Sequence, residues 1–248
     1  MLTTGVVSVT FRPLLPDQIL SLASQAGLDG VEWGSDVHVP VGDFDHAARV
    51  GQMTCAAHLR TVSYGSYFKA GYSDPASFAD VIATAKALSA PNIRIWAGER
   101  GSEAEENRTA VADSIRACAA ACSDAGMTVS LEFHPGTLTD HYESARRLVE
   151  EVAHDNLRLY WQPNQFQDEA YNLAALRAVL PYLSHVHVFA WEGSGKYPLA
   201  QHERIWREYI DILKGSPRDH AMLMEFVCDG SQRQFLEDAQ TLHRFLEK

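Results

Sequence analysis

The chain has 248 residues, of which 46% are hydrophobic and 21% charged, so it carries enough apolar material for a large globular core. Its formal net charge of -11 argues against nucleic acid or an anionic membrane as a partner, because both require clustered Lys and Arg. The four cysteines form no CxxC pair, and no run approaches the roughly 20 apolar residues that span a bilayer. With no secretory pattern at the start, these features predict a cytoplasmic protein.

Short runs with strand-like alternation are separated by longer helical runs, which is typical of βα units around a parallel sheet. The predicted strands are 5–10, 27–34, 54–59, 92–97, 128–134, 157–162, 183–191 and 221–227. The predicted helices are 16–26, 45–50, 74–88, 102–125, 140–152, 168–180, 202–214 and 231–245, with an aromatic loop at 64–72. Eight such units predict one (β/α)₈ TIM barrel, a single domain over residues 1–248.

One stretch of the fifth unit, MTVSLEFHPGTLT, gives the strongest indication of function. Leu131 and Phe133 fall on one face of the strand, whereas Glu132 and His134 fall on the other. A buried parallel strand is normally a continuous apolar run, so this polar face needs a further reason. Active sites of barrel enzymes lie at the C-terminal ends of the strands, so a carboxylate at this position is explained by a role in catalysis or binding.

The same alternation directs polar side chains from other strand ends toward the mouth of the barrel. The predicted inward set consists of Ser8 or Thr10, Glu32, His58, Arg94, Trp96, Glu132, His134, Gln162, His187 and Glu225. Six of the eight predicted strands thus contribute an ionisable group. This convergence predicts a functional site at the mouth.

Four residues of this set, Glu132, Gln162, His187 and Glu225, come from the fifth to eighth strands and form a contiguous arc. Three oxygen donors and one imidazole suit a divalent cation such as Mn²⁺ or Mg²⁺, with Co²⁺ and Zn²⁺ as alternatives. Two carboxylates on opposite sides of a bound sugar can also transfer a proton between carbons through an enediolate. The arc therefore predicts a metal site in which Glu132 and Glu225 carry the proton.

The ordered motifs GLDGVEW, RIWAG, LEFHPG, HVHVF and MEF resemble the xylose isomerase-like barrel family of sugar isomerases and epimerases. The resemblance spans nearly the whole chain. It implies metal-assisted isomerisation or epimerisation of a small sugar, sugar phosphate or hydroxy-keto acid, with two glutamates as acid and base. It also implies a Glu, Asp, His and Glu ligand set, which by position corresponds here to Glu132, Gln162, His187 and Glu225.

Gln162 departs from that pattern, and the missing negative charge predicts weaker metal binding. The loop after the seventh strand has no clear counterpart of the arginine found in several family epimerases. Lys196 is the nearby cation, and it suits a phosphate or carboxylate. The predicted substrate-binding residues are His58, Trp96, His134, Gln165, Trp191 and Lys196.

The same residues are also compatible with other roles. Glu132 can form a buried ion pair with Arg94, with or without a catalytic role, and His187 or Glu225 can be an ordinary buried polar residue. A lyase of the inosose dehydratase kind would begin with the same proton abstraction, and a non-catalytic polyol-binding barrel would need no metal. A homo-oligomer is also compatible with the sequence.

Overall fold

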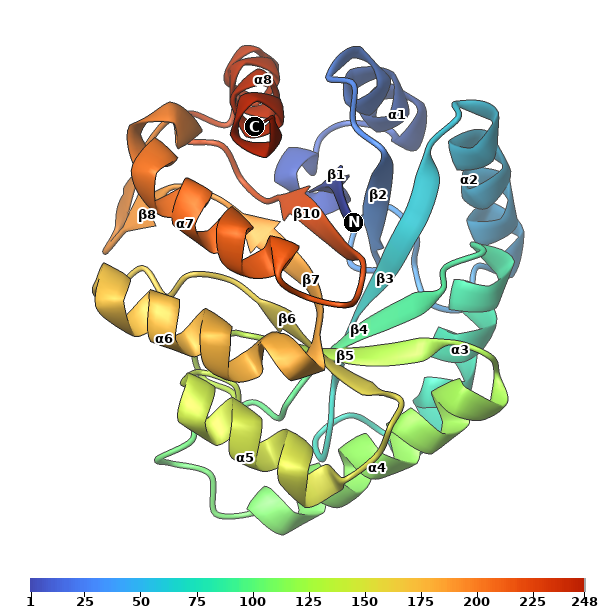
Figure 1. Ribbon diagram of the computed structural model, residues 1–248. Helices are drawn as coiled ribbons and strands as arrows, with labels where there is room; N and C mark the ends of the chain where they lie inside the picture. Colours follow the sequence, from blue (N-terminus) through green and yellow to red (C-terminus); the bar gives the residue numbers. More distant parts are fainter. Residues whose placement is uncertain (248) are drawn as a thin grey trace.

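Eight parallel strands close into a barrel in the computed structural model, which describes residues 1–247 (Figure 1). The barrel strands are β1 (Leu2–Val7), β2 (Gly30–Gly34), β3 (Arg60–Lys69), β4 (Asn92–Trp96), β5 (Thr128–Glu132), β6 (Leu157–Trp161), β7 (Leu183–Val188) and β10 (His220–Met224). Each pairs with its neighbour in that order, and β10 pairs with β1 to complete the circle. The predicted (β/α)₈ TIM barrel is confirmed.

The helices form a ring outside these strands (Figure 1). They are α1 (Pro16–Gln25), α2 (Phe44–Ala56), α3 (Phe78–Ala87), α4 (Arg108–Asp124), α5 (Tyr142–Val152), α6 (Glu169–Val179), α7 (Glu203–Lys214) and α8 (Gln232–Leu246). Local sequence sets several helix starts, because Asp168 accepts a hydrogen bond from the Tyr171 amide and Ser231 accepts one from the Gln234 amide. Within residues 1–247, no helix is both long and apolar enough to cross a bilayer.

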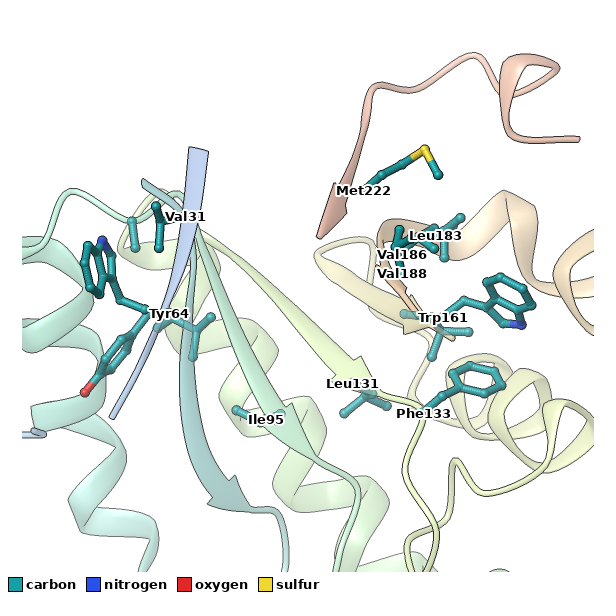
Figure 2. Packing of buried hydrophobic residues seen from close by; sticks show 14 of the residues in the cluster. Val31, Tyr64, Ile95, Leu131, Phe133, Trp161, Leu183, Val186, Val188 and Met222 are labelled. Atoms are coloured by element: carbon teal, nitrogen blue, oxygen red, sulfur yellow. The ribbon is translucent and has the colours of Figure 1, made fainter. Parts of the chain in front are cut away.

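The main core lies between the barrel and the helix ring. Outward-facing residues of neighbouring strands, such as Ile95, Leu131 and Trp161, fill this layer (Figure 2). Trp161 faces the helices as predicted, with its ring centroid 5.0 Å from that of Tyr209 on α7. A smaller apolar cluster, which includes Val7, Val62, Tyr160 and Leu223, fills part of the barrel interior.

The third strand is the main correction to the predicted elements. α2 continues through Ala56, where a strand is predicted at 54–59, and β3 occupies residues that include most of the predicted aromatic loop. Thr54 suits the helix because its hydroxyl donates to the Val50 carbonyl and accepts from Trp33 Nε1. His58 therefore lies exposed in the turn before β3, at the end of the barrel opposite the mouth. Its predicted role in substrate binding is wrong.

Three smaller boundaries also differ. β1 ends at Val7, so Ser8 and Thr10 lie in a 3₁₀ turn, where Ser8 accepts a hydrogen bond from the Gly34 amide. α4 begins at Arg108, six residues after its predicted start at 102. β7 ends at Val188, and the segment after it forms a separate antiparallel hairpin of β8 (Trp191–Glu192) and β9 (Gly195–Lys196).

Candidate metal and proton-transfer site

The side chains that end β5, β6, β7 and β10 meet at the mouth of the barrel. Glu132 is the last residue of β5, Gln162 directly follows β6, His187 is the penultimate residue of β7, and Glu225 directly follows β10. Glu132, His187 and Glu225 each offer a ligand atom, and these atoms lie within 4.8 Å of one another. Strand alternation thus brings together all four residues of the predicted arc.

His187 lies at the centre of this group, and its Nδ1 faces three oxygens. Nδ1 lies 2.8 Å from Oε1 of Gln162, 3.2 Å from Oε2 of Glu225 and 3.6 Å from Oε1 of Glu132. Burial opposes the charged imidazole, but Glu225 and Glu132 outweigh it and raise the pKa of His187. Burial likewise opposes the charge on Glu225, yet His187 outweighs it and lowers the pKa of that carboxyl. The site therefore stabilises charge in spite of its burial.

Arg94 supplies a positive charge on the other side of Glu132. Its Nη1 donates to Oε2 of Glu132, and its Nε donates to Oε1 of Glu32 at 2.7 Å. Trp96 Nε1 donates to the same Oε2 of Glu132. The predicted Arg94–Glu132 ion pair is confirmed, and it leaves Oε1 of Glu132 facing His187.

The donor set of the arc fits a divalent metal ion. The carboxylates of Glu132 and Glu225 are buried close together at the mouth, and His187 Nδ1 and Gln162 Oε1 lie beside them. Carboxylate, amide and imidazole ligands together suit Mn²⁺ or Mg²⁺, and also Co²⁺ or Zn²⁺. A shared cation would offset the repulsion between the two carboxylates.

Two aromatic groups border the site. On one side the rings of Trp96 and His134 stack with centroids 4.3 Å apart. On the other side Trp191 of β8 stacks with Phe226, the residue after Glu225, at 6.0 Å. Lys196 Nζ lies 4.4 Å from the centre of the Trp191 ring. Of the predicted substrate-binding residues, Trp96 and His134 thus lie beside the metal arc, and Trp191 and Lys196 lie against Phe226, which follows Glu225 in the chain.

A cavity of about 280 Å³ adjoins the arc between the loops after β5 and β6. Gln162 lines it together with His134, Asn164 and the predicted residue Gln165, and Phe166 lies exposed at its rim. Polar side chains and the apolar groups of Phe133, Pro135 and Pro163 line this cavity together, as in a pocket for a small polar molecule.

Sequence reasoning missed two residues next to the site and misjudged a third. Phe226 and Tyr67 were absent from the predicted set, although an aromatic residue beside a strand-end carboxylate or a buried arginine is a usable indication. Glu32 belongs to the predicted inward set, but its side chain is fully buried and binds Arg94 instead of reaching the mouth.

Comparison with known proteins agrees with this architecture. One family model, described as xylose isomerase-like TIM barrel, matches residues 20–247. The comparison with curated proteins finds no match.

Three solved structures illustrate the likeness. The probable 3-DHS dehydratase AsbF from Bacillus anthracis has a TM-score of 0.78 and 18% identity, covering 98% of this chain and 99% of that chain. D-psicose 3-epimerase from Clostridium cellulolyticum H10, solved with D-tagatose, has a TM-score of 0.73 and 14% identity, covering 98% of each chain. A barrel protein from Mycobacterium smegmatis in complex with magnesium has a TM-score of 0.71 and 13% identity, covering 98% of this chain and 96% of that chain.

At these identities the solved structures show a shared fold, whereas the family model covers most of the chain directly. The closed barrel, the ordered strand-end residues and this match lead to one conclusion: the chain belongs to the xylose isomerase-like TIM barrel family.

Proposed function

We propose that this protein is an isomerase or epimerase that transfers a proton between carbons of a small sugar, sugar phosphate or hydroxy-keto acid. One observation carries the proposal. Glu132 and Glu225, from strands separated by β6 and β7 around the barrel, direct carboxylate oxygens at the same nitrogen of His187 at the mouth. A carbon held between these carboxylates would have an acid and a base within reach.

The proposed reaction begins when one carboxylate takes the proton from the carbon next to the substrate carbonyl. The C–H electrons form the carbon–carbon double bond of an enediolate, and the carbonyl oxygen becomes negative. The other carboxyl, which carries a proton at this point, delivers it to the opposite face of the same carbon in an epimerisation. In an aldose–ketose isomerisation the proton goes to the neighbouring carbon, while a hydroxyl proton moves between the two oxygens.

The residues of the arc would hold the divalent ion implied by the family. Glu132, Gln162, His187 and Glu225 would be its ligands, and His187 would have to release its Nδ1 proton on binding. When bound, the ion supplies positive charge that polarises the substrate carbonyl and favours the negative oxygen. Gln162 removes one negative charge from the usual set, so we expect modest metal affinity.

Features around the arc support a polyhydroxylated substrate. The stacked Trp96 and His134 rings on one side, and Trp191 stacked with Phe226 on the other, would give apolar walls to a site whose other groups are polar. Lys196 is an exposed cation that would meet a phosphate or carboxylate on the substrate. The epimerase solved with D-tagatose shares this barrel fold, which is consistent with a sugar ligand. The cytoplasmic location and a homo-oligomeric state stay predictions.

A lyase is the second candidate, favoured by the likeness to the probable 3-DHS dehydratase. It would use the same first step, after which the enolate would expel a β-hydroxyl group that leaves as water with the proton from the second carboxyl. The same two glutamates would therefore serve either reaction.

The test is a substrate screen in D₂O with added Mn²⁺, using ketoses, ketose phosphates and cyclic hydroxy-ketones, followed by NMR and mass spectrometry. Deuterium at carbon without loss of water is the expected result. A product lighter by one water would identify the lyase. Thermal stabilisation by a polyol with no deuterium in it would contradict both reactions and identify a polyol-binding barrel.

A further inference from the structure

Arg94 on β4 lies fully buried between two carboxylates, one on the adjacent strand β5 and one on β2, which lies on the far side of β3. Its Nε donates to Oε1 of Glu32 on β2 at 2.7 Å, and its Nη1 donates to Oε2 of Glu132 on β5. Arg94 is 1% exposed and Glu32 is 0% exposed, so water screens neither charge. A planar guanidinium is suited to such a bridge because its donors have fixed directions.

The backbone of β3 and the Tyr67 ring pack closely against the guanidinium. Gly65 on β3 pairs with Arg94 in register, and a Cβ on Gly65 would lie 2.6 Å from Nη2 of Arg94. Tyr67 places its ring centre 5.4 Å from the guanidinium carbon. Tyr67 also adopts a left-handed backbone with φ of 55°, which a non-glycine residue rarely does. Such strain persists only where the surrounding structure holds it in place.

Within residues 1–247, Arg94 is the hydrogen-bond partner of the Glu32 side chain. Glu32 is buried below the mouth, and its Oε2 has no hydrogen-bond partner among residues 1–247. Burial is the main cause of the raised pKa of the Tyr160 hydroxyl, and the nearby charge of Glu32 raises it further. A buried carboxylate kept for stability alone would be a poor choice, because an apolar residue often serves as well.

The bridge determines which oxygen of Glu132 faces the site. Oε2 receives both Arg94 Nη1 and Trp96 Nε1, so the carboxylate plane is fixed from two directions. Oε1 is left to face His187 at 3.6 Å. A rotation of this carboxylate would move Oε1 away from Nδ1 and from the position of a shared ligand.

We propose that Glu32, Gly65 and Tyr67 form a clamp around Arg94 that fixes the orientation of Glu132 for its work at the mouth. Glu32 is a positioning residue, since it acts through Arg94 and touches neither substrate nor metal. This inference rests on the proposed function, in which Glu132 is a metal ligand and proton carrier. It adds that a residue on β2, inside the barrel, controls the orientation of Glu132 on β5 through Arg94 on β4.

The test uses Mn²⁺ alone as the probe, with calorimetry for affinity and electron paramagnetic resonance for ligand geometry. Glu32→Gln keeps the size of the side chain but removes its charge, and Gly65→Ala displaces the guanidinium without changing any charge. We expect each variant to bind Mn²⁺ about tenfold more weakly and to show an altered resonance line shape. With a substrate from the screen, kcat should fall about tenfold or more while KM stays within about threefold.

Glu151→Gln is the matched control, because Glu151 also pairs with an arginine, Arg108 at 2.8 Å, but on the outer helices. It should leave Mn²⁺ binding and the line shape unchanged. Thermal unfolding reports the stability of every variant. If Gly65→Ala does not fold, Glu32→Gln alone decides.

Glu132→Gln separates the two proposals. If Glu132→Gln binds Mn²⁺ like the wild type and retains turnover, the proposed function is wrong, and the clamp, which would act by orienting Glu132, is overturned with it. If Glu132→Gln loses binding or turnover while Glu32→Gln keeps affinity, line shape and kcat, the clamp is overturned and the proposed function stands. A lower melting temperature for Glu32→Gln with all three site measurements unchanged would likewise overturn the clamp.

Discussion

Nδ1 of His187 lies 3.2 Å from Oε2 of Glu225, and both side chains are buried at the end of the barrel. Burial works against the charge on each group, but each charge stabilises the other. The pKa of His187 is therefore raised above its ordinary value of 6.5, and the pKa of Glu225 is lowered below its ordinary value of 4.5. Folding, metal binding and pH are coupled through this pair.

The stability of the metal-free protein should show this coupling. The proton on His187 stabilises the folded state fully below 6.5, and this contribution is lost as pH rises through the raised pKa. The charge on Glu225 stabilises it fully above 4.5, and this contribution is lost as pH falls through the lowered pKa. In urea unfolding, the free energy of unfolding of wild type should exceed that of Glu225→Gln by about 2 kcal/mol between pH 4.5 and pH 6.5. The difference should be smaller below and above this range. A difference independent of pH would contradict this account.

Restoring the missing charge at position 162 should strengthen metal binding. Gln162→Glu keeps the length of the side chain and adds a carboxylate next to His187 Nδ1. We expect Mn²⁺ to bind about tenfold more tightly, which corresponds to about 1.4 kcal/mol, in calorimetry at constant pH. Gln165→Glu is the control, since Gln165 lines the cavity but lies outside the arc. Equal gains in both variants would indicate a general charge effect.

Lys196 should discriminate between charged and neutral substrates. Its exposed ammonium group lies over Trp191 and Phe226, at 4.4 and 5.2 Å from the two ring centres. Lys196→Met should raise KM about fivefold for a phosphorylated or carboxylated substrate and less than twofold for a neutral one, because an exposed charge contributes about 1 kcal/mol or less. The wild-type preference should also weaken with added salt. The same increase in KM for both kinds of substrate would refute this role.

The cysteines should differ sharply in reactivity. Cys118 and Cys122 are buried in α4, and burial raises the pKa of each thiol to about 12, whereas Cys55 is exposed near the end of α2. At about pH 8 a thiol reagent should therefore label Cys55 at least about a hundredfold faster than Cys118 or Cys122 in the native protein, as peptide mass spectrometry can show. Labelling of all three at one rate would mean that the helix is not packed as described.

The residues of the arc could be predicted because they follow from alternation and strand order alone. Alternation with apolar residues determines the face of Glu132 on β5 and of His187 near the end of β7, whereas Glu225 is identified as the carboxylate that directly follows the apolar strand β10. In a parallel barrel the C-terminal ends of all strands meet at one mouth, and no further information is needed to bring these residues together.

The bridge from Glu32 to Glu132 could be predicted only in part. Sequence alternation indicates the Arg94–Glu132 contact between neighbouring strands, but Glu32 belongs to a strand two positions away from β4. Its depth in the barrel depends on a register shift between β2 and β3 at Val31 and Glu32, which the sequence pattern does not reveal. The third strand was misplaced for a related reason, since residues 54–58 alternate by chance within a helix that tertiary contacts extend.

The most direct test of the central claim is the rate of proton exchange in Glu132→Gln and Glu225→Gln. With a substrate from the screen and Mn²⁺ present, deuterium incorporation is measured for wild type and both variants, with unfolding curves to confirm that each variant is folded. The account predicts that each variant loses at least about a hundredfold in rate, since each removes one of the two proton carriers. If both folded variants exchange at the wild-type rate, the two carboxylates do not carry the proton and the account is contradicted.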